Sequence, residues 1–399
     1  MRNNRKLPVR GLATSLSMAL SLALFTPAGS AMAQNTQHQT ALVGTWTSVP
    51  DAPAVQKPAH ASEGLYRLQM NSDGTLTPLD VIKMKSPSWI VKSRDGRFAY
   101  TTNEENAGTV TALAIDAAGA VRVLNVVNSH GQQPTHATLS PDGRFLFVSN
   151  YSVAKGGAGV AVFPVHADGS LGDQVQSFAF DQGSGVVKTR QESGHAHATV
   201  FTPDGSYLYA ADLGDDRLHA WRYDASQAQP LQPDPSREVR FAPGSGPRHM
   251  VFSRDGQHAW VILEMAGELA TLKVSDNRLT LAGQVKLYGD RNSTEYKSGG
   301  GIILSPDGHY LIVSNRGADN QLLVFRIGAD GRLGTPKRYA ADGIEPRAFS
   351  FDDSGKYLYV ANVFSNTITL FDFDPSNGEL KARGPAASIA TPTDIKFFN

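Results

Sequence analysis

One stretch, a polar turn followed by an apolar strand, is repeated six times along this chain of 399 residues. The glycine that ends each turn marks the repeat, at Gly96, Gly143, Gly205, Gly256, Gly308 and Gly355. Successive glycines are 47, 62, 51, 52 and 47 residues apart. A period near 50 residues indicates that the chain folds as an array of similar structural units.

Each unit has the pattern of antiparallel β-structure. Segment 136–143, HATLSPDG, alternates apolar and polar residues and ends in a turn whose glycine supplies the positive φ that closes a hairpin. A strand rich in Phe, Leu and Val follows, then another at 160–165, and a second turn at 167–171 leads to a more polar outer strand. Four short antiparallel strands per unit are typical of a propeller blade.

Seven innermost strands are expected, one more than the number of turns. They begin at Pro87, Pro134, His195, Pro247, Gly299, Pro346 and Pro392. The last of them runs into the C-terminus without partners, whereas 41–47, 64–70 and 79–85 resemble the three missing strands of its blade. We therefore predict an all-β, seven-bladed β-propeller over residues 34–399. Its C-terminal strand joins the N-terminal strands, which closes the ring and hides two sheet edges.

The first 33 residues have a different character. Basic residues lie at positions 2, 5, 6 and 10, an apolar run extends from about residue 12 to 25, and Ala31-Met32-Ala33 provides the small residues of a cleavage site. The apolar run is shorter than the roughly 20 residues of a membrane span. A secretory signal peptide at 1–33 is therefore favoured over an anchor. We expect a periplasmic or secreted protein without membrane attachment after cleavage.

Composition narrows the possible partners. Removal of the predicted signal peptide leaves 33 basic against 37 acidic residues, a net charge near −4. A mildly acidic chain without basic runs is a poor candidate for binding nucleic acid. The chain has no cysteine, which excludes disulfides and cysteine-ligated metals. We expect no cofactor, and a monomer or weak homodimer.

The ends of the repeated strands vary, although their turns do not. Residues equally far before and after a hairpin turn lie opposite each other, so positions about eight before and eight after each glycine meet at one end of a blade. Because the innermost strands line the central channel, these positions surround one channel mouth. Chemically distinct groups gather there, namely His197, Arg248, Arg347, Glu104, Tyr151, Glu264 and Arg316. Such a set indicates an active site, although any one member could be a solvated or ion-paired strand end.

The histidines leave a choice open. His195 and His197 lie on one face of a strand, but two histidines without a third ligand are weak evidence for a metal, and we expect none. The segment from His195 to the turn is one residue longer than its siblings, so a β-bulge could decide which of the two enters the mouth. His136 and His249 fall one position away and are expected in the core or in contact with a neighbouring blade.

The 62-residue spacing reflects a long polar segment at 181–194. It carries Arg190 and Gln191 toward the mouth, which favours a substrate-contacting loop, with a plain surface loop as the alternative. A second long segment at 286–300 precedes the fifth turn and has the same two interpretations.

These residues resemble the seven-bladed lactonase family, which includes propeller-type bacterial 6-phosphogluconolactonases and the fungal carboxy-cis,cis-muconate lactonizing enzyme. The most specific matches are Arg190-Gln191 with His195-Ala-His197, Gly246-Pro-Arg248-His249 with Glu264, and Ser314-Asn-Arg316-Gly317. The resemblance places the family's proposed catalytic set on His197 (or His195), Arg248, Glu264 and Arg316. Family members commonly carry a glutamate where this chain has Gly301.

Lactone hydrolysis passes through a tetrahedral oxyanion, which Arg248 or Arg316 can stabilise, and either Glu264 or His197 can act as the base on water. We predict a metal-independent lactonase for a sugar-type lactone of the 6-phosphogluconolactone kind, with substrate contacts from His195, Glu104, Tyr151, Arg190, Gln191 and Arg347. The alternatives are a muconate-type lactonizing enzyme and a non-catalytic binding propeller of the cell envelope. A quinone-holding propeller is disfavoured by the low tryptophan count of four. Substitutions at His197, Arg248 and Glu264 are expected to abolish activity with little change in melting temperature.

Overall fold

The computed structural model describes residues 39–48, 61–152, 156–289 and 297–398. The predicted signal peptide at 1–33 and residues 290–296 of the second long segment lie outside these ranges. Within them the chain forms 29 β-strands and one short 3₁₀ helix, η1 (Pro235–Arg237). No helix in the described ranges is long and apolar enough to span a bilayer.

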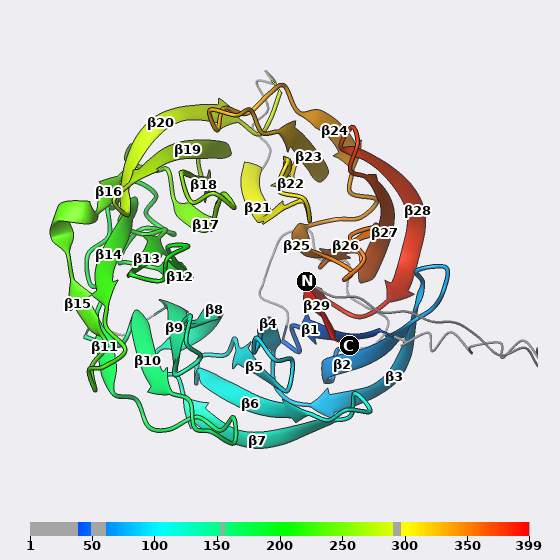
Figure 1. Ribbon diagram of the computed structural model, residues 1–399, viewed down its shortest axis with the longest axis horizontal. Helices are drawn as coiled ribbons and strands as arrows, with labels where there is room; N and C mark the ends of the chain where they lie inside the picture. The colour runs from blue at the N-terminus through cyan, green and yellow to red at the C-terminus, as the bar shows by residue number, and fades with distance from the viewer. Residues whose placement is uncertain (1–38, 49–60, 153–155, 290–296, 399) are drawn as a thin grey trace, which may run out of the picture. The chain divides into compact units, whose positions relative to one another are not determined.

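Figure 1 shows seven sheets arranged around a central axis, each one a blade of antiparallel strands. From the centre outward, the closing blade contains β29 (Pro392–Phe398), β1 (Thr40–Thr45), β2 (Gly64–Met70) and β3 (Leu76–Lys83). The next blade contains β4 (Pro87–Lys92), β5 (Phe98–Asn103), β6 (Thr109–Ile115) and β7 (Val121–Asn128). It is followed by β8 (Gln132–Leu139), β9 (Phe145–Ser152), β10 (Val160–Pro164) and β11 (Gln176–Phe178).

The remaining four blades continue around the ring. The first contains β12 (Ala196–Phe201), β13 (Tyr207–Asp212), β14 (Arg217–Tyr223) and β15 (Leu231–Pro233), and β16 (Val239–Arg240) also pairs with β14. The second contains β17 (Pro247–Phe252), β18 (His258–Leu263), β19 (Glu268–Ser275) and β20 (Arg278–Lys286). The third contains β21 (Lys297–Leu304), β22 (Tyr310–Gly317), β23 (Gln321–Arg326) and β24 (Lys337–Ala340). The fourth contains β25 (Pro346–Phe351), β26 (Tyr357–Asn362), β27 (Thr367–Asp374) and β28 (Glu379–Ser388). The predicted seven-bladed propeller is confirmed.

The repeated turn is held by its own side chains. The Ser140 hydroxyl donates to Asp142 and accepts the N–H of Phe145 at 3.0 Å, while Asp142 accepts the N–H of Arg144. Gly143 has φ of +73°, in the left-handed region that glycine adopts without strain. This local set of hydrogen bonds explains why the turn is the least variable part of each unit.

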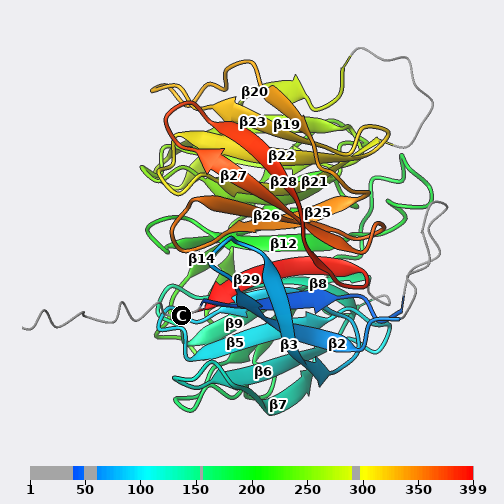
Figure 2. The ribbon, with the colours of Figure 1, turned by 90° about the vertical axis from the view of Figure 1, so that its right-hand side faces the viewer.

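The ring closes as predicted. Residues 40–45 of β1 pair antiparallel with 392–398 of β29, and Figure 2 shows the two strands side by side. Ile395 and Phe397 pack into a cluster with Tyr359 and Ile368 of the preceding blade. On the other side, Asp394 accepts the backbone N–H of Ile90 in β4 at 3.0 Å. The C-terminal strand therefore joins its own blade to both neighbouring blades.

Every innermost strand shifts register at the same place. In β12 the shift leaves His197 between Ala196 and Ala198 without a partner on β13, and in β25 it does the same for Arg347. Equivalent shifts occur in the other blades, at Ser88, Thr135, the pair Arg248 and His249, the pair Gly300 and Gly301, and Thr393. A β-bulge of this kind re-aims the side chain of the extra residue. The bulge is thus a property of all seven blades rather than of the one longer segment.

Candidate active site

A cavity of about 460 Å³ lies among the inner ends of the blades. Eight of the ten residues predicted for the site line it, namely Glu104, Tyr151, Arg190, His197, Arg248, Glu264, Arg316 and Arg347. The structure therefore brings together side chains that are as far as 243 positions apart in the chain, as for Glu104 and Arg347. Their catalytic and binding roles remain predictions.

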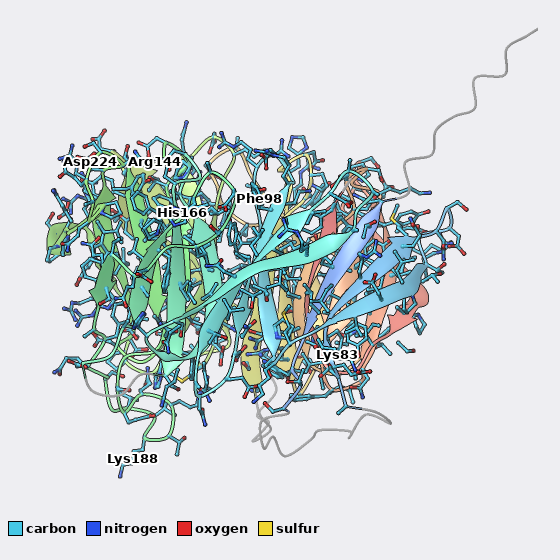
Figure 3. The ribbon with its side chains drawn as sticks, turned by 90° about the horizontal axis from the view of Figure 1, so that it is seen from below. Lys83, Phe98, Arg144, His166, Lys188 and Asp224 are labelled. Atoms are coloured by element: carbon cyan, nitrogen blue, oxygen red, sulfur yellow. The ribbon has the colours of Figure 1, made fainter. Side chains whose placement is uncertain are left out.

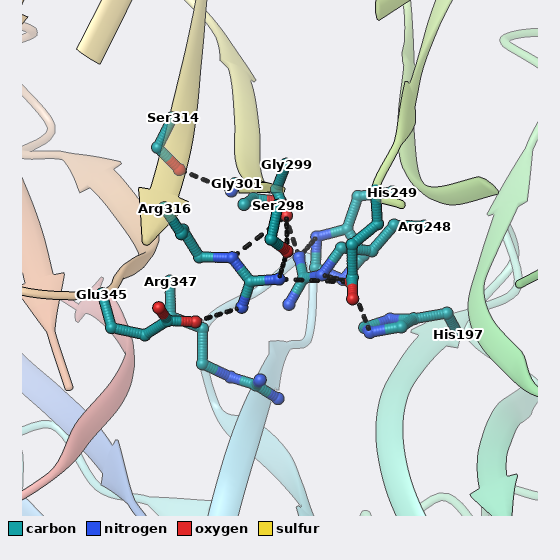
Figure 4. A network of polar contacts seen from close by, with 12 residues as sticks. His197, Arg248, His249, Ser298, Gly299, Gly301, Ser314, Arg316, Glu345 and Arg347 are labelled. Carbon is teal, nitrogen blue, oxygen red and sulfur yellow. Dashed lines mark hydrogen bonds and ion pairs between the residues drawn. The ribbon is translucent and has the colours of Figure 1, made fainter. Parts of the chain in front are cut away.

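Glu264, directly after β18, is the centre of a polar network, and Figure 4 labels its partners Arg248, Arg316 and His197. The residue is only 3% exposed, and its carboxylate meets three guanidinium groups. Oε1 lies 2.8 Å from Nη2 of Arg190, while Oε2 lies 2.8 Å from Nε of Arg248 and 3.2 Å from Nη2 of Arg316. Both oxygens are therefore occupied by cations from three different segments.

The arginines decide the charge state of this carboxyl. Burial alone would raise the pKa of Glu264, but Arg316, Arg190 and Arg248 together hold it far below its usual range. Burial, together with the charge on Arg316, lowers the pKa of Arg248 to about 9, so this guanidinium remains charged at neutral pH. Glu264 is thus a permanently ionised, weakly basic anchor for the arginines.

His197 is the neutral member of the site. Its Nε2 lies 3.9 Å from Oε2 of Glu264, and its ring packs edge-on against Tyr151 and His249. Burial and then the nearby charge of Arg248 hold the pKa of His197 well below its usual value. The imidazole is therefore uncharged at neutral pH, and it lies at the cavity wall.

Backbone carbonyls from a run of three glycines support two of the arginines. The carbonyl of Gly300 accepts Nη1 of Arg248 at 2.7 Å, and that of Gly299 accepts Nε of Arg316 at 3.0 Å. A Cβ on Gly300 would lie 2.3 Å from the Ser314 hydroxyl, so the strand can approach only because it lacks side chains. The glycine run therefore supports the two arginines with carbonyl oxygens and adds no charge of its own.

A second ion pair forms another part of the cavity wall. The Oε2 atom of Glu104 accepts Nη2 of Arg347 at 3.1 Å and the indole N–H of Trp46 at 3.0 Å. The Arg347 guanidinium also lies over the Trp46 ring, 4.5 Å from its centre. Cation–π contact and ion pairing fix this arginine in one orientation.

The long segment before β12 contributes Arg190, as predicted. Its Nε donates to the Tyr151 hydroxyl at 2.9 Å and its Nη2 reaches Glu264. The same segment protrudes at Lys188, which Figure 3 places on the side of the molecule opposite Arg144 and His166. The cavity therefore opens on the face away from the repeated turns.

Two predicted substrate contacts do not line the cavity. His195 directs Nδ1 to the carbonyl of Tyr151, 2.6 Å away, and stacks on the Tyr151 ring. Gln191 is fully buried, and its Nε2 donates to the Leu213 carbonyl and to Asp216. Neither residue lines the cavity, because the bulge turns His197 rather than His195 inward and the Gln191 side chain is buried under its own loop. Substrate contact at these two positions stays a prediction.

Several cavity residues were missed. Glu345 pairs with Arg316 at 2.7 Å, and Gln133, Trp46, Glu105 and Phe364 also line the wall. Glu345 and Gln133 directly precede the proline that opens an innermost strand, and their φ values of +62° and +51° are rare for residues other than glycine. The proline that opens each innermost strand marks this position in the sequence. If the repeats had been compared one or two residues beyond each strand end, Glu345 and Gln133 would both have been included.

A further polar cluster lies outside the cavity lining. Asp212, Asp215 and His219 are close enough in the described part of the chain to hold a cation. Their partners, however, are within the protein: His219 meets Asp212 at 3.2 Å and Glu238 at 3.1 Å, and Arg217 pairs with Asp215. Burial opposes protonation of His219, but the two carboxylates raise its pKa. The charged groups of this cluster thus pair with one another.

The sequence of this chain is similar to those of known proteins. A family model described as "Lactonase, 7-bladed beta-propeller" matches residues 40–397. The chain is 31% identical over 325 residues to a 6-phosphogluconolactonase of Formosa agariphila, which covers 80% of this chain and 90% of that protein. It is 29% identical over 344 residues to a 6-phosphogluconolactonase of Bacillus subtilis, covering 85% and 95% respectively.

Solved structures agree with these matches. A periplasmic gluconolactonase of Pseudomonas aeruginosa is similar with a TM-score of 0.83 at 36% identity, covering 90% of this chain and 99% of that one. A putative 6-phosphogluconolactonase of Bacteroides fragilis has a TM-score of 0.80 at 31% identity, with 92% and 99% covered. The chain therefore belongs to the lactonase family of seven-bladed β-propellers.

Proposed function

We propose that the cavity hydrolyses the ester of a sugar-type lactone, with the neutral His197 as the base that activates water. The observation that carries this proposal is the contrast between the two candidate bases. Glu264 is held ionised by three arginines that occupy both its oxygens, whereas the uncharged His197 lines the cavity with Nε2 3.9 Å from that carboxylate. A base needs a free lone pair near the reacting water, and in this proposal the imidazole of His197 supplies it.

The reaction follows from these positions. Water attacks the lactone carbonyl as its proton moves to Nε2 of His197, which gives a tetrahedral oxyanion. The charge on that oxygen is stabilised by the guanidinium groups of Arg248 or Arg316, which are already fixed and need no reorganisation. The ring C–O bond then breaks, the alkoxide takes the proton from His197, and an open-chain hydroxy acid leaves.

The substrate class and the compartment belong to the same proposal. A cavity of about 460 Å³ has room for a monosaccharide-sized lactone and its water. Similar proteins are named for both phosphorylated and unphosphorylated gluconolactones, and the one named as periplasmic is a gluconolactonase. Together with the signal-like segment at 1–33, this favours a lactonase of the periplasm or the exterior.

Replacing His197 with glutamine should lower kcat by about 10²–10⁴-fold with a small change in KM, because a base acts on the chemical step. The assay is lactone consumption by the purified protein on a panel of plain, phosphorylated and muconate-type lactones. His166→Gln is the matched control, since His166 is exposed on the opposite face (Figure 3). Parental rates in the His197 variant would rule out this residue as the base.

The pH dependence should separate this base from an ordinary histidine. His197 works in its neutral form, so activity falls only as pH drops through its folded pKa, which burial and Arg248 hold well below 6.5. We expect kcat/KM to stay level from pH 7 down through 6.5 and to decline only in more acidic solution. Initial rates corrected for spontaneous ring opening give the profile. Half-loss of activity near pH 6.5 would contradict the assignment.

A further inference from the structure

The turn between the second and third strands of a blade carries a recurring interblade link. Asn320, Asn366 and Asp216 occupy this turn with φ values of +49°, +57° and +55°. In each case the Oδ1 atom accepts the backbone N–H of the residue just before the innermost strand of the next blade. The partners are Glu345 at 2.9 Å, Thr391 at 2.9 Å and Gly246 at 2.7 Å.

Asp216 does more than its two counterparts. Besides Gly246, its carboxylate accepts the N–H of Gly244 at 2.8 Å and the side-chain amide of Gln191 at 2.8 Å. It is 4% exposed. Two oxygens that only accept hydrogen bonds suit three N–H donors, whereas an asparagine would turn its own NH₂ group toward one of them. The change from Asn to Asp therefore coincides with the blade that carries the long insertion.

Gly246 and Gln191, which both bond to Asp216, are each connected to Glu264. On one side, the carbonyl of Gly246 accepts the backbone N–H of Glu264 at 2.7 Å, and the chain continues into β17 with Arg248. On the other side, Gln191 directly follows Arg190, whose guanidinium is 2.8 Å from the Glu264 carboxylate. One buried carboxylate thus connects the backbone that bears Glu264 with the loop that covers it.

We propose that Asp216 is a positioning residue that latches the loop 181–195, and so determines where Arg190 meets Glu264 and the substrate. The link to catalysis rests on the proposed lactonase function. Asp216 lines no part of the cavity and acts through Gln191 and the loop. The other anchors of this loop support the geometry, since Gln191 also donates to the Leu213 carbonyl and Ser184 donates to the Gly214 carbonyl.

The test is the Asp216→Ala variant of the full chain, which removes both carboxylate oxygens and with them the bonds to Gly246, Gly244 and Gln191. Asparagine would keep an oxygen in the place of Oδ1, which Gly246 and Gln191 share, and would therefore leave the latch in place. Loss of the bond to Gln191 should free the loop, so trypsin should cut after the exposed Lys188 at least fivefold faster, as followed by mass spectrometry of that bond. KM for the lactone should rise several-fold while kcat changes less than twofold. Asp224→Ala, at an exposed turn, is the matched control.

A second variant covers the case in which Asp216→Ala fails to fold. Gln191→Met keeps the buried volume but removes the amide that reaches Asp216, and it should reproduce the faster cleavage and the higher KM. Unchanged cleavage in both variants would overturn the latch. Faster cleavage with unchanged KM would overturn its role in positioning Arg190. If the parent protein opens no lactone, the proposed function fails, and the cleavage rates alone then support or overturn the latch.

Discussion

Replacing Glu264 with glutamine is expected to abolish lactonase activity and to destabilise the protein by about 3–5 kcal/mol, the usual cost of removing one partner from a buried ion pair. Glutamine has nearly the same shape, so the loss is one of charge. Arg190, Arg248 and Arg316 would then face one another with no carboxylate between them. Without their anchor the arginines cannot hold the oxyanion, and kcat/KM should fall by at least about 10²-fold.

This result would revise the expectation from sequence that melting temperature stays nearly unchanged. That expectation treated Glu264 as a catalytic group without a part in stability, whereas it is 3% exposed and pairs with three cations. Thermal and urea unfolding of the variant give the measurement. Glu379→Gln is the control, because its pair with Lys337 is exposed on both sides and contributes at most about 1 kcal/mol. Equal stability of the Glu264 and Glu379 variants would contradict the buried network.

Deleting the last strand, β29, should prevent folding altogether. Removal of residues 392–399 takes away all six of the pairings with β1 and the apolar side chains of Ile395, Phe397 and Phe398. It also exposes an unpaired edge of β1 and opens the ring, and such an edge favours aggregation. We expect insoluble protein, or a soluble form without a cooperative thermal transition. Both would be seen by fractionation and circular dichroism.

The control for this truncation is removal of Asn399 alone. That variant keeps every residue of β29 and should fold and melt as the parent does. A milder variant, Ile395→Ala, should lower the free energy of unfolding by about 2–5 kcal/mol, the range for large-to-small substitutions in a core. A truncated protein that still melts cooperatively at the parental temperature would show that closure by β29 is dispensable.

The fold was predictable because its determinants are local. The Ser-Pro-Asp-Gly turn closes through side chains within five residues of one another, as at Ser140 and Phe145, and so repeats as a readable pattern. The mouth positions followed from hairpin symmetry alone. That is why eight of the ten chosen residues line one cavity.

The features of the site that could not be predicted depend on contacts between residues that are distant in the sequence or on the exact strand register. Whether His195 or His197 faces inward is set by a register shift that the pattern does not encode. The side chain of Gln191 is directed inward by its hydrogen bond to Asp216, which is 25 positions further along the sequence. The convergence of three arginines on Glu264 joins separate segments, so neither its ion pairs nor its stabilising role could be derived from spacing.

The register shift shared by all seven innermost strands has an evolutionary consequence. It sets a single residue apart from the strand pairing in five blades and a pair of residues in the other two, while the repeated turn depends on other positions. Selection can therefore alter ligand preference through the bulge residues that line the cavity, such as Thr135, without rebuilding the scaffold. A ring of repeated units thus gains chemical variables that its repeated turns do not constrain.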